Sequence, residues 1–165
     1  MKSPPLFTRN GSLSTLMLCA LLLLHSSAPG RAQSLCVEMI TAKGRVRSLP
    51  ASSDATLRLR FRHSIYGSQV DEVFSLLPAG FRLTQLRYGE ARLVEFYGHE
   101  NARLEDGQWV VTPAPILLPS LHLHLSRDAA MSVNLENAGK IQHLKIEPAN
   151  QHRLEVASCD RSAHD

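Results

Sequence analysis

The fold of this chain is decided around residues 63–74, His-Ser-Ile-Tyr-Gly-Ser-Gln-Val-Asp-Glu-Val-Phe. Directly before this stretch, residues 57–62 alternate apolar and basic side chains with a period of two. This period is typical of a strand that buries one face, so we predict the apolar side chains on the inner face and the arginines on the outer face. Residues 70–77 are predicted to return as a second strand. The turn between them, residues 63–69, then closes a hairpin.

The rest of the chain repeats this pattern of short strands. Turn residues separate the apolar runs at a spacing of about 8–12 residues, and no long apolar pattern of helical period occurs. The pattern predicts one all-β domain, built as an antiparallel sandwich or as a barrel. Further strands are predicted at 34–40, 81–88, 109–111, 121–125, 131–135, 141–146 and 153–157, with a short return at 45–49.

Three segments depart from simple alternation. The apolar pattern slips between Leu83 and Leu86, which indicates a β-bulge. Residues 93–96 lie between two glycine-centred segments and are predicted to form a short strand or a helical turn. Residues 112–119 contain three prolines, which favours an extended loop or an edge strand.

The first 32 residues have the features of a secretory signal peptide. Lys2 and Arg9 are basic, residues 13–24 are apolar, and Gly30 and Ala32 are small residues at the spacing that a signal peptidase accepts. The apolar run is shorter than the roughly 20 residues of a membrane-spanning helix. Cleavage after Ala32 is therefore predicted, with a retained anchor or a lipoprotein as the alternatives.

Removal of residues 1–32 changes the charge of the protein. The whole chain has 18 basic and 15 acidic residues, and three of the basic residues and none of the acidic ones lie in this segment. The domain left behind is formally neutral, so its charge does not favour nucleic acid as a partner. We expect a β-rich domain at 33–159 and a flexible tail at 160–165. Contact with a membrane is expected only through an uncleaved signal segment.

Two cysteines are expected in the processed chain, Cys36 and Cys159, at opposite ends of the domain. An exported protein with two cysteines favours one disulfide, which requires the first and last strands to lie side by side. Closing so long a loop would stabilise the fold by about 4–5 kcal/mol in the chain-entropy model. Two free thiols are the alternative. A periplasmic or extracellular location follows from the signal segment.

The candidate ligand-binding residues are His63, Ser64, Glu72, Tyr88 and His99. His63 ends one strand of the hairpin and Glu72 lies near the start of the other, so we expect them to approach each other across the turn. A histidine and a carboxylate can bind a metal, orient a polar ligand or transfer protons. The alternative is that Glu72 only fixes the turn through hydrogen bonds.

A second candidate site is formed by His122 and His124, which point to the same face of one predicted strand. Two imidazoles at this spacing can share a divalent metal, with His99 or Glu100 as a third ligand. The alternative is that leucines bury one face of this strand while both histidines face water. The basic stripe of Arg58, Arg60 and Arg62 also has two interpretations. It is either a solvated face of the sheet or a surface that binds an anion or an acidic partner.

Residues 63–65 and 70–74 resemble a family of small exported bacterial proteins known as domain of unknown function eighteen-fifty. Members have a signal segment, then a strand that ends in His-Ser, and a Glu shortly before an aromatic residue. They are often encoded beside TAXI-type tripartite (TRAP) transporters. The resemblance implies export and an accessory role in solute uptake, with transporter components as partners. It implies no chemistry.

The sequence therefore favours a non-enzymatic exported domain that binds a partner protein or a small polar solute. It contains no nucleophile motif, no zinc-protease motif and no phosphate-binding glycine loop. The second interpretation is a metal-binding protein or a metal-dependent enzyme, and the third is a structural envelope protein. No cofactor is expected, apart from a divalent metal in the second interpretation.

Overall fold

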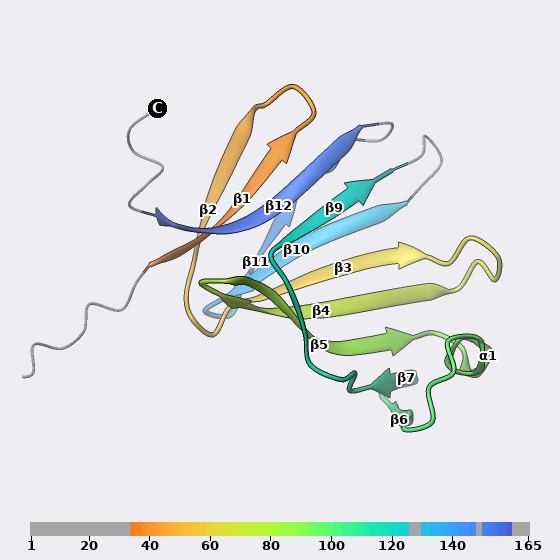
Figure 1. Cartoon of the computed structure of the whole chain (residues 1–165). Coiled ribbons are helices and arrows are strands. Elements are labelled where there is room, and N and C mark those ends of the chain that lie inside the picture. The colour runs from red at the N-terminus through yellow and green to blue at the C-terminus, as the bar shows by residue number, and fades with distance from the viewer. Residues whose placement is uncertain (1–33, 126–129, 148–149, 160–165) are drawn as a thin grey trace, which may run out of the picture. The chain divides into compact units, whose positions relative to one another are not determined.

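The strands of the domain form two antiparallel sheets (Figure 1). The computed structural model describes residues 34–125, 130–147 and 150–159, which all belong to one compact unit, Gln33–Asp165. The predicted signal peptide and the predicted tail at 160–165 lie outside the described residues. In the described part of the chain, no helix is long and apolar enough to cross a membrane.

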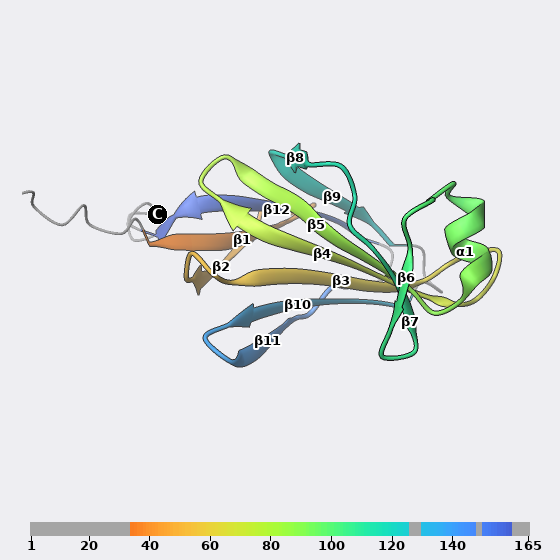
Figure 2. The ribbon, with the colours of Figure 1, turned by 90° about the horizontal axis from the view of Figure 1, so that it is seen from below.

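The small sheet has the strand order β2-β1-β12-β9. The large sheet has the order β11-β10-β3-β4-β5-β7-β6, and β8 pairs with β5 beside this path. Within the described residues one helix, α1 (Ala91–Phe96), follows β5 at one end of the large sheet (Figure 2). The strand bounds are β1 Leu35–Thr41, β2 Val46–Ala51, β3 Thr56–Arg62, β4 Gln69–Leu77, β5 Gly80–Tyr88, β6 Arg103–Glu105, β7 Gln108–Val111, β8 Ile116–Leu118, β9 Ser120–His124, β10 Met131–Asn137, β11 Lys140–Leu144 and β12 Gln151–Ser158.

The main hydrophobic core lies between the two sheets. It combines Val37 and Leu154 of the small sheet with Leu57, Phe74 and Phe81 of the large sheet, all of them buried. Two separate sheets that share one core form a sandwich. The prediction of an all-β antiparallel domain is thus confirmed, and the structure decides between the two predicted architectures in favour of the sandwich.

A second, smaller core lies at the α1 end of the large sheet. It contains Val70 of β4, Tyr88 of β5, Leu93 and Val94 of α1, and Val111 of β7. Residues 93–96 are therefore part of a helical turn, one of the two predicted conformations. The helix is short, so it is stabilised by burying Leu93 and Val94 against the sheet rather than by its own hydrogen bonds.

The predicted bulge is present between β4 and β5. Val73 lies opposite Gln85 and Phe74 lies opposite Leu83, so Thr84 is left without a partner in the register. The Thr84 hydroxyl donates a hydrogen bond to the Val73 carbonyl at 3.0 Å. The extra residue explains why the apolar alternation of this strand slips.

A disulfide joins Cys36 and Cys159, with Cα atoms 5.1 Å apart. It ties β1 to the end of β12, and these strands are antiparallel neighbours with Cys36 opposite Ala157. Both the disulfide and the adjacency of the first and last strands are confirmed. A disulfide of this kind is typical of proteins that fold in an oxidising compartment.

The strand predictions fail only at short edge elements. Residues 103–105 form β6, which was not predicted. The proline-containing segment provides β8, a three-residue edge strand against β5, and this is one of its two predicted conformations. The return at 45–49 is β2, shifted by one to two residues. Edge strands bury little apolar area, so their alternation is weak in the sequence.

Candidate functional site

His63 is held by the turn that joins β3 to β4. Its backbone N–H donates to the Ser68 carbonyl and its carbonyl accepts from the Gly67 N–H, both at 2.8 Å. The Tyr66 N–H points at His63 Nδ1 over 3.4 Å. Gly67 has a φ of 66°, a left-handed conformation that glycine adopts without steric cost. The turn therefore fixes the imidazole, which is only 7 % exposed.

The C-terminus of α1 places the next two rings, Tyr97 and His99. The His99 N–H donates to the Val94 carbonyl and the Gly98 N–H donates to the Glu95 carbonyl. These bonds, with Gly98 at a φ of 69°, form a Schellman cap. The cap reverses the chain, so His99 returns toward β5 while Tyr97 lies beside the helix end.

Six rings meet at this end of the large sheet and are here called the ring cluster. His63 stacks on Tyr66 at 5.3 Å between ring centroids and meets the edges of Phe96 and Tyr97 at 5.2 and 5.8 Å. Tyr88 stacks on Tyr97 and on His99, at 5.6 Å each. Aromatic pairs at such distances add about 0.5–1.5 kcal/mol each beyond the burial of their area. The members are His63, Tyr66, Tyr88, Phe96, Tyr97 and His99.

A hydrogen bond of 2.8 Å joins the Tyr88 hydroxyl to His99 Nε2. Burial raises the pKa of Tyr88 well above its ordinary value, and the neighbouring Tyr97 and Glu72 raise it further. The hydroxyl therefore keeps its proton, and it donates to Nε2 or accepts from it according to the tautomer of His99. Two of the predicted ligand-binding residues, Tyr88 and His99, are thus in direct contact.

Glu72 does not lie where the sequence suggested. In the register of the hairpin it faces Leu59 on β3 and Leu86 on β5, whereas the residue opposite Arg62 is Gln69. The expectation that Glu72 and His63 approach across the turn is therefore wrong, because Glu72 is the fourth residue of β4 and its partner Leu59 lies four residues before His63. Glu72 points to the inner face, and burial raises its pKa.

Glu72 is still electrostatically connected to the ring cluster. Its carboxylate is among the causes that raise the pKa of Tyr88 and of Tyr97. Among the ion pairs of the described residues, none involves Glu72. A half-buried carboxylate beside phenols and no cation is a group that a ligand could engage.

The outer part of this end is apolar and exposed. Ile65, Phe96 and Tyr97 are 70, 49 and 45 % exposed. The Arg92 guanidinium lies over the Tyr66 ring at 4.8 Å and is paired with Glu90. Ser64 is exposed on the turn beside Ile65. Phe96 and Tyr97 contact each other, and Ile65 precedes Tyr66, whose ring meets Phe96. The three exposed side chains Ile65, Phe96 and Tyr97 are here called the apolar tip.

His122 and His124 lie on the outer face of β9, both exposed, while Leu121 and Leu123 are buried on the other side. His122 Nε2 is 3.1 Å from the Ser120 hydroxyl. His99 lies in the ring cluster, so the structure does not bring it to this pair as a third ligand. Across residues 34–125, 130–147 and 150–159, no three His, Cys, Asp or Glu side chains gather as a metal-binding group.

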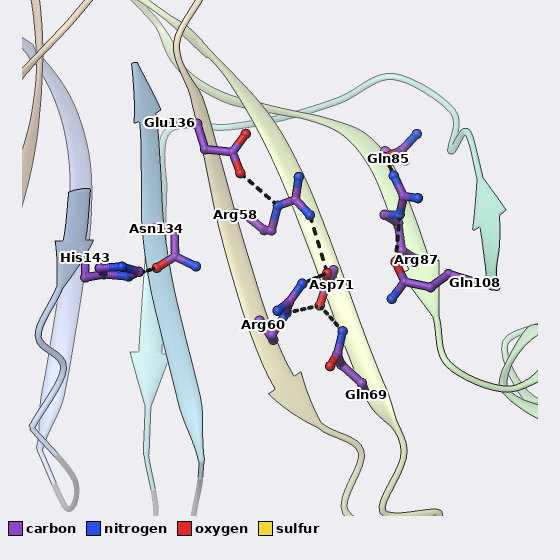
Figure 3. Close-up of polar contacts among 10 residues, drawn as sticks. All are labelled: Arg58, Arg60, Gln69, Asp71, Gln85, Arg87, Gln108, Asn134, Glu136 and His143. Carbon is purple, nitrogen blue, oxygen red and sulfur yellow. Dashed lines mark hydrogen bonds and ion pairs between the residues drawn. The ribbon is translucent and has the colours of Figure 1, made fainter. Parts of the chain in front are cut away.

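The basic stripe of β3 belongs to a polar network on the outer face of the large sheet (Figure 3). Arg60 donates from Nε and Nη2 to the two oxygens of Asp71, at 2.9 and 2.8 Å, and these hydrogen bonds raise the pKa of Arg60. Gln69 donates to the same carboxylate at 3.1 Å, and Arg58 lies 3.6 Å from it. Asp71 is fully buried beneath these groups. Two of the three arginines are therefore engaged within the protein.

Sequence reasoning missed the rings that complete the cluster. Tyr66, Phe96 and Tyr97 were not among the predicted site residues. Their one local signal is the order Phe-Tyr-Gly after a short apolar run, which predicts a helix that ends at a glycine cap and turns its last rings back. Which surface those rings would meet is set by the sheet, not by the local sequence.

Comparisons of the chain with protein-family models, with curated proteins and with solved structures found no match. The resemblance drawn from residues 63–65 and 70–74 therefore stays a prediction.

Proposed function

We propose that this protein is an exported, non-enzymatic β-sandwich that binds a partner protein through the apolar tip. The observation that carries the proposal is that Phe96 and Tyr97, which contact each other, are both exposed, together with Ile65 on the β3–β4 turn. Exposed apolar side chains that gather over a fixed support are a common feature of protein interaction sites.

The support beneath the apolar tip favours tight binding. Phe96 packs edge-on against Tyr97 at 5.1 Å, and both rings contact the buried His63. Rings that are already held in place lose little conformational freedom when a partner covers them. Aromatic side chains of this kind contribute a large share of the binding energy in many interfaces.

The place of the apolar tip fits a macromolecular partner. The β3–β4 turn and α1 project from the end of the large sheet in both views (Figures 1 and 2). A projecting surface is accessible to another protein. Arg92, Glu90 and Glu95 lie around it and would supply a charged rim.

A small polar solute is the second candidate ligand, favoured by one observation. Glu72, Tyr88 and His99 place a carboxylate, a phenol and an imidazole beneath the apolar tip, and the carboxylate has a raised pKa. Such groups orient polar ligands in proteins. In this reading His63 would be part of the wall, and Ser64 would lie at the entrance.

Separate observations support the proposed compartment and the proposed partner. The Cys36–Cys159 disulfide and the signal-like residues 1–32 support a periplasmic or extracellular protein. Components of a TRAP-type transporter are the proposed partners, and this point rests on the resemblance alone. Metal binding through His122 and His124, and a purely structural envelope role, stay as predictions.

Site-specific crosslinking in cells that export the protein tests the apolar tip. A photoreactive phenylalanine at position 97 is expected to crosslink to a partner, whereas the same residue at position 141 is not. Ile141 is a matched control because it is 59 % exposed on a different strand, β11. Equal crosslinking at both positions would show that the apolar tip is not the binding surface.

Once the crosslinked partner is purified, its affinity for variants of the protein measures how much the apolar tip contributes to binding. Phe96→Ala with Tyr97→Ala is expected to weaken binding at least about tenfold, since two interface aromatics together contribute more than 1.4 kcal/mol. The control, Leu117→Ala with Ile141→Ala, removes a similar exposed apolar area and is expected to bind like the parent. If both double variants bind equally well, the proposal is wrong.

A further inference from the structure

The inner face of the small sheet becomes polar near the β1–β2 turn. Arg47 lies opposite Met39, and His152 lies opposite Thr41, so these side chains share the face that elsewhere buries leucines. The depression that they border has a volume of about 280 Å³. Its lining consists of Met39, Thr41, Arg45, Val46, Arg47, Lys145, Glu147 and His152.

His152 is the buried polar group of this depression. It is 3 % exposed, and its Nε2 lies 3.2 Å from the Glu147 carbonyl oxygen. A carbonyl oxygen only accepts, so Nε2 carries a proton and Nδ1 of the neutral ring is an acceptor. Among the described residues, Nδ1 has no hydrogen-bond partner. An unsatisfied buried acceptor destabilises the fold, and a donor from a ligand would satisfy it.

Three cations border the same depression. Arg45 and Arg47 come from the β2 side, and Lys145 follows β11 of the large sheet. Within the described ranges none of them forms an ion pair, in contrast to Arg58, Arg60, Arg92, Arg103 and Arg153. Glu147 is the one carboxylate of the lining. The excess positive charge favours an anion.

We propose that this depression binds a small oxyanion that also carries a hydroxyl group. The oxyanion would accept from the guanidinium groups and the Lys145 ammonium, and the hydroxyl would donate to His152 Nδ1. Met39 and Val46 would cover an apolar part of the ligand. The site lies apart from the apolar tip, and the inference does not rest on the function proposed for that surface.

A rival explanation exists for Arg47 alone. β2 is the edge strand of the small sheet, and an inward-pointing charge on an edge strand prevents pairing with another chain. This explanation accounts neither for the unpartnered nitrogen of His152 nor for Lys145, which comes from the other sheet. The oxyanion accounts for all three.

Titration calorimetry of the exported protein with inorganic phosphate and with sulfate tests the inference. Both are tetrahedral oxyanions, but at neutral pH only phosphate keeps a hydroxyl that can donate to Nδ1. Phosphate is expected to bind at least about tenfold more tightly than sulfate, because only phosphate can donate a hydrogen bond to the buried acceptor. No binding of phosphate, or equal binding of both anions, would overturn the inference.

Two variants locate the binding in the chain. Arg47→Ala with Lys145→Ala is expected to weaken phosphate binding at least about tenfold, since it removes two charge-assisted contacts. Arg62→Ala with Lys140→Ala changes the net charge equally and is expected to leave binding unchanged. Both pairs are exposed, so neither is expected to unfold the protein. Equal loss in the two variants would mean a general charge effect and overturn the site.

Nitrogen-15 spectra of the histidine rings give a readout that is independent of affinity. On addition of phosphate, the Nδ1 signal of His152 is expected to shift from the position of a free acceptor to that of a hydrogen-bonded one. Sulfate is expected not to cause this shift. A His152 signal that does not respond to phosphate would contradict the proposed contact.

Discussion

Asp71 and Glu72 are neighbours in the chain and carry the same charge, yet they occupy opposite environments. Asp71 points to the outer face of the large sheet and is fully buried under Arg60, Gln69 and Arg58. Glu72 points to the inner face, between Leu59 and Leu86, and has no ion-pair partner among the described residues. The outer face of this sheet therefore provides partners for its carboxylate, Asp71, that the inner face does not provide for Glu72.

The difference comes from the residues across the hairpin. In the register of β3 and β4, Arg60 lies opposite Asp71 and Leu59 lies opposite Glu72. Alternation with a period of two places every second side chain on the same face, so adjacent residues face different neighbours. A partner, and not the depth of burial, decides whether a carboxylate stabilises the fold.

The largest effect is expected for Asp71→Asn, which removes the charge without changing the shape. The free energy of unfolding should fall by about 2–3 kcal/mol, because a buried acceptor of charge-assisted hydrogen bonds is lost while Arg58 and Arg60 can still turn partly to water. Denaturant unfolding measures the change. Asp106→Asn is the matched control, at an exposed turn position with positive φ where asparagine is equally suited. If both variants unfold alike, the network on the outer face does not stabilise the fold.

A smaller effect should separate the two arginines that contact Asp71. Arg60→Ala is expected to destabilise by about 1–1.5 kcal/mol, since Arg60 makes two short bonds to the carboxylate. Arg58→Ala should cost about half as much, because Arg58 lies 3.6 Å from Asp71 and 3.3 Å from Glu136. Double-mutant cycles with Asp71→Asn measure each coupling energy. A larger coupling for Arg58 than for Arg60 would contradict this ranking.

The smallest effect is expected for Glu72→Gln, and it depends on pH. Burial raises the pKa of Glu72 above the ordinary value of 4.5, so the folded protein binds the proton more tightly than the unfolded chain. The stability of the parent therefore falls as the pH rises from 4.5 through the higher pKa of the folded state. Glu72→Gln lacks this loss. It should be as stable as the parent in acid and more stable at neutral pH.

Thermal unfolding across this pH range measures the difference, and exposed Glu95→Gln serves as the control. A Glu72→Gln variant that is less stable than the parent at neutral pH would show that the ionised Glu72 has a stabilising partner. In that case both Asp71 and Glu72 would have stabilising partners. The proposed difference between the two faces of the sheet would then be wrong.

Much of the fold was accessible from the sequence, because strands that bury one face carry a strong local signal. The alternation of residues 57–62 predicted β3 and its inner face, and the slip between Leu83 and Leu86 predicted the bulge at Thr84. The two cysteines predicted both the disulfide and the pairing of β1 with β12. The choice between sandwich and barrel was not accessible, since it depends on which strands remain unpaired.

The candidate site was only partly accessible. His63, Tyr88 and His99 were selected as polar residues near turns, and the structure places all three in the ring cluster. Tyr97 joins His63 to Tyr88, and its position depends on the cap at Gly98 and on the packing of α1 against the sheet. The relation of Glu72 to His63 was predicted wrongly, because Glu72 is the fourth residue of β4 and pairs with Leu59, whereas His63 lies beyond the end of β3.

By itself the sequence determined the all-β class, the strands with one buried face, the bulge and the cysteine pair. These features follow from the order of apolar and polar residues within short segments, so neighbouring residues suffice to specify them. The tertiary structure alone decided the sandwich, the meeting of six rings at one end and the cationic depression around His152. Each of these depends on side chains from segments far apart in the chain, and their contacts exist only after the two sheets have packed.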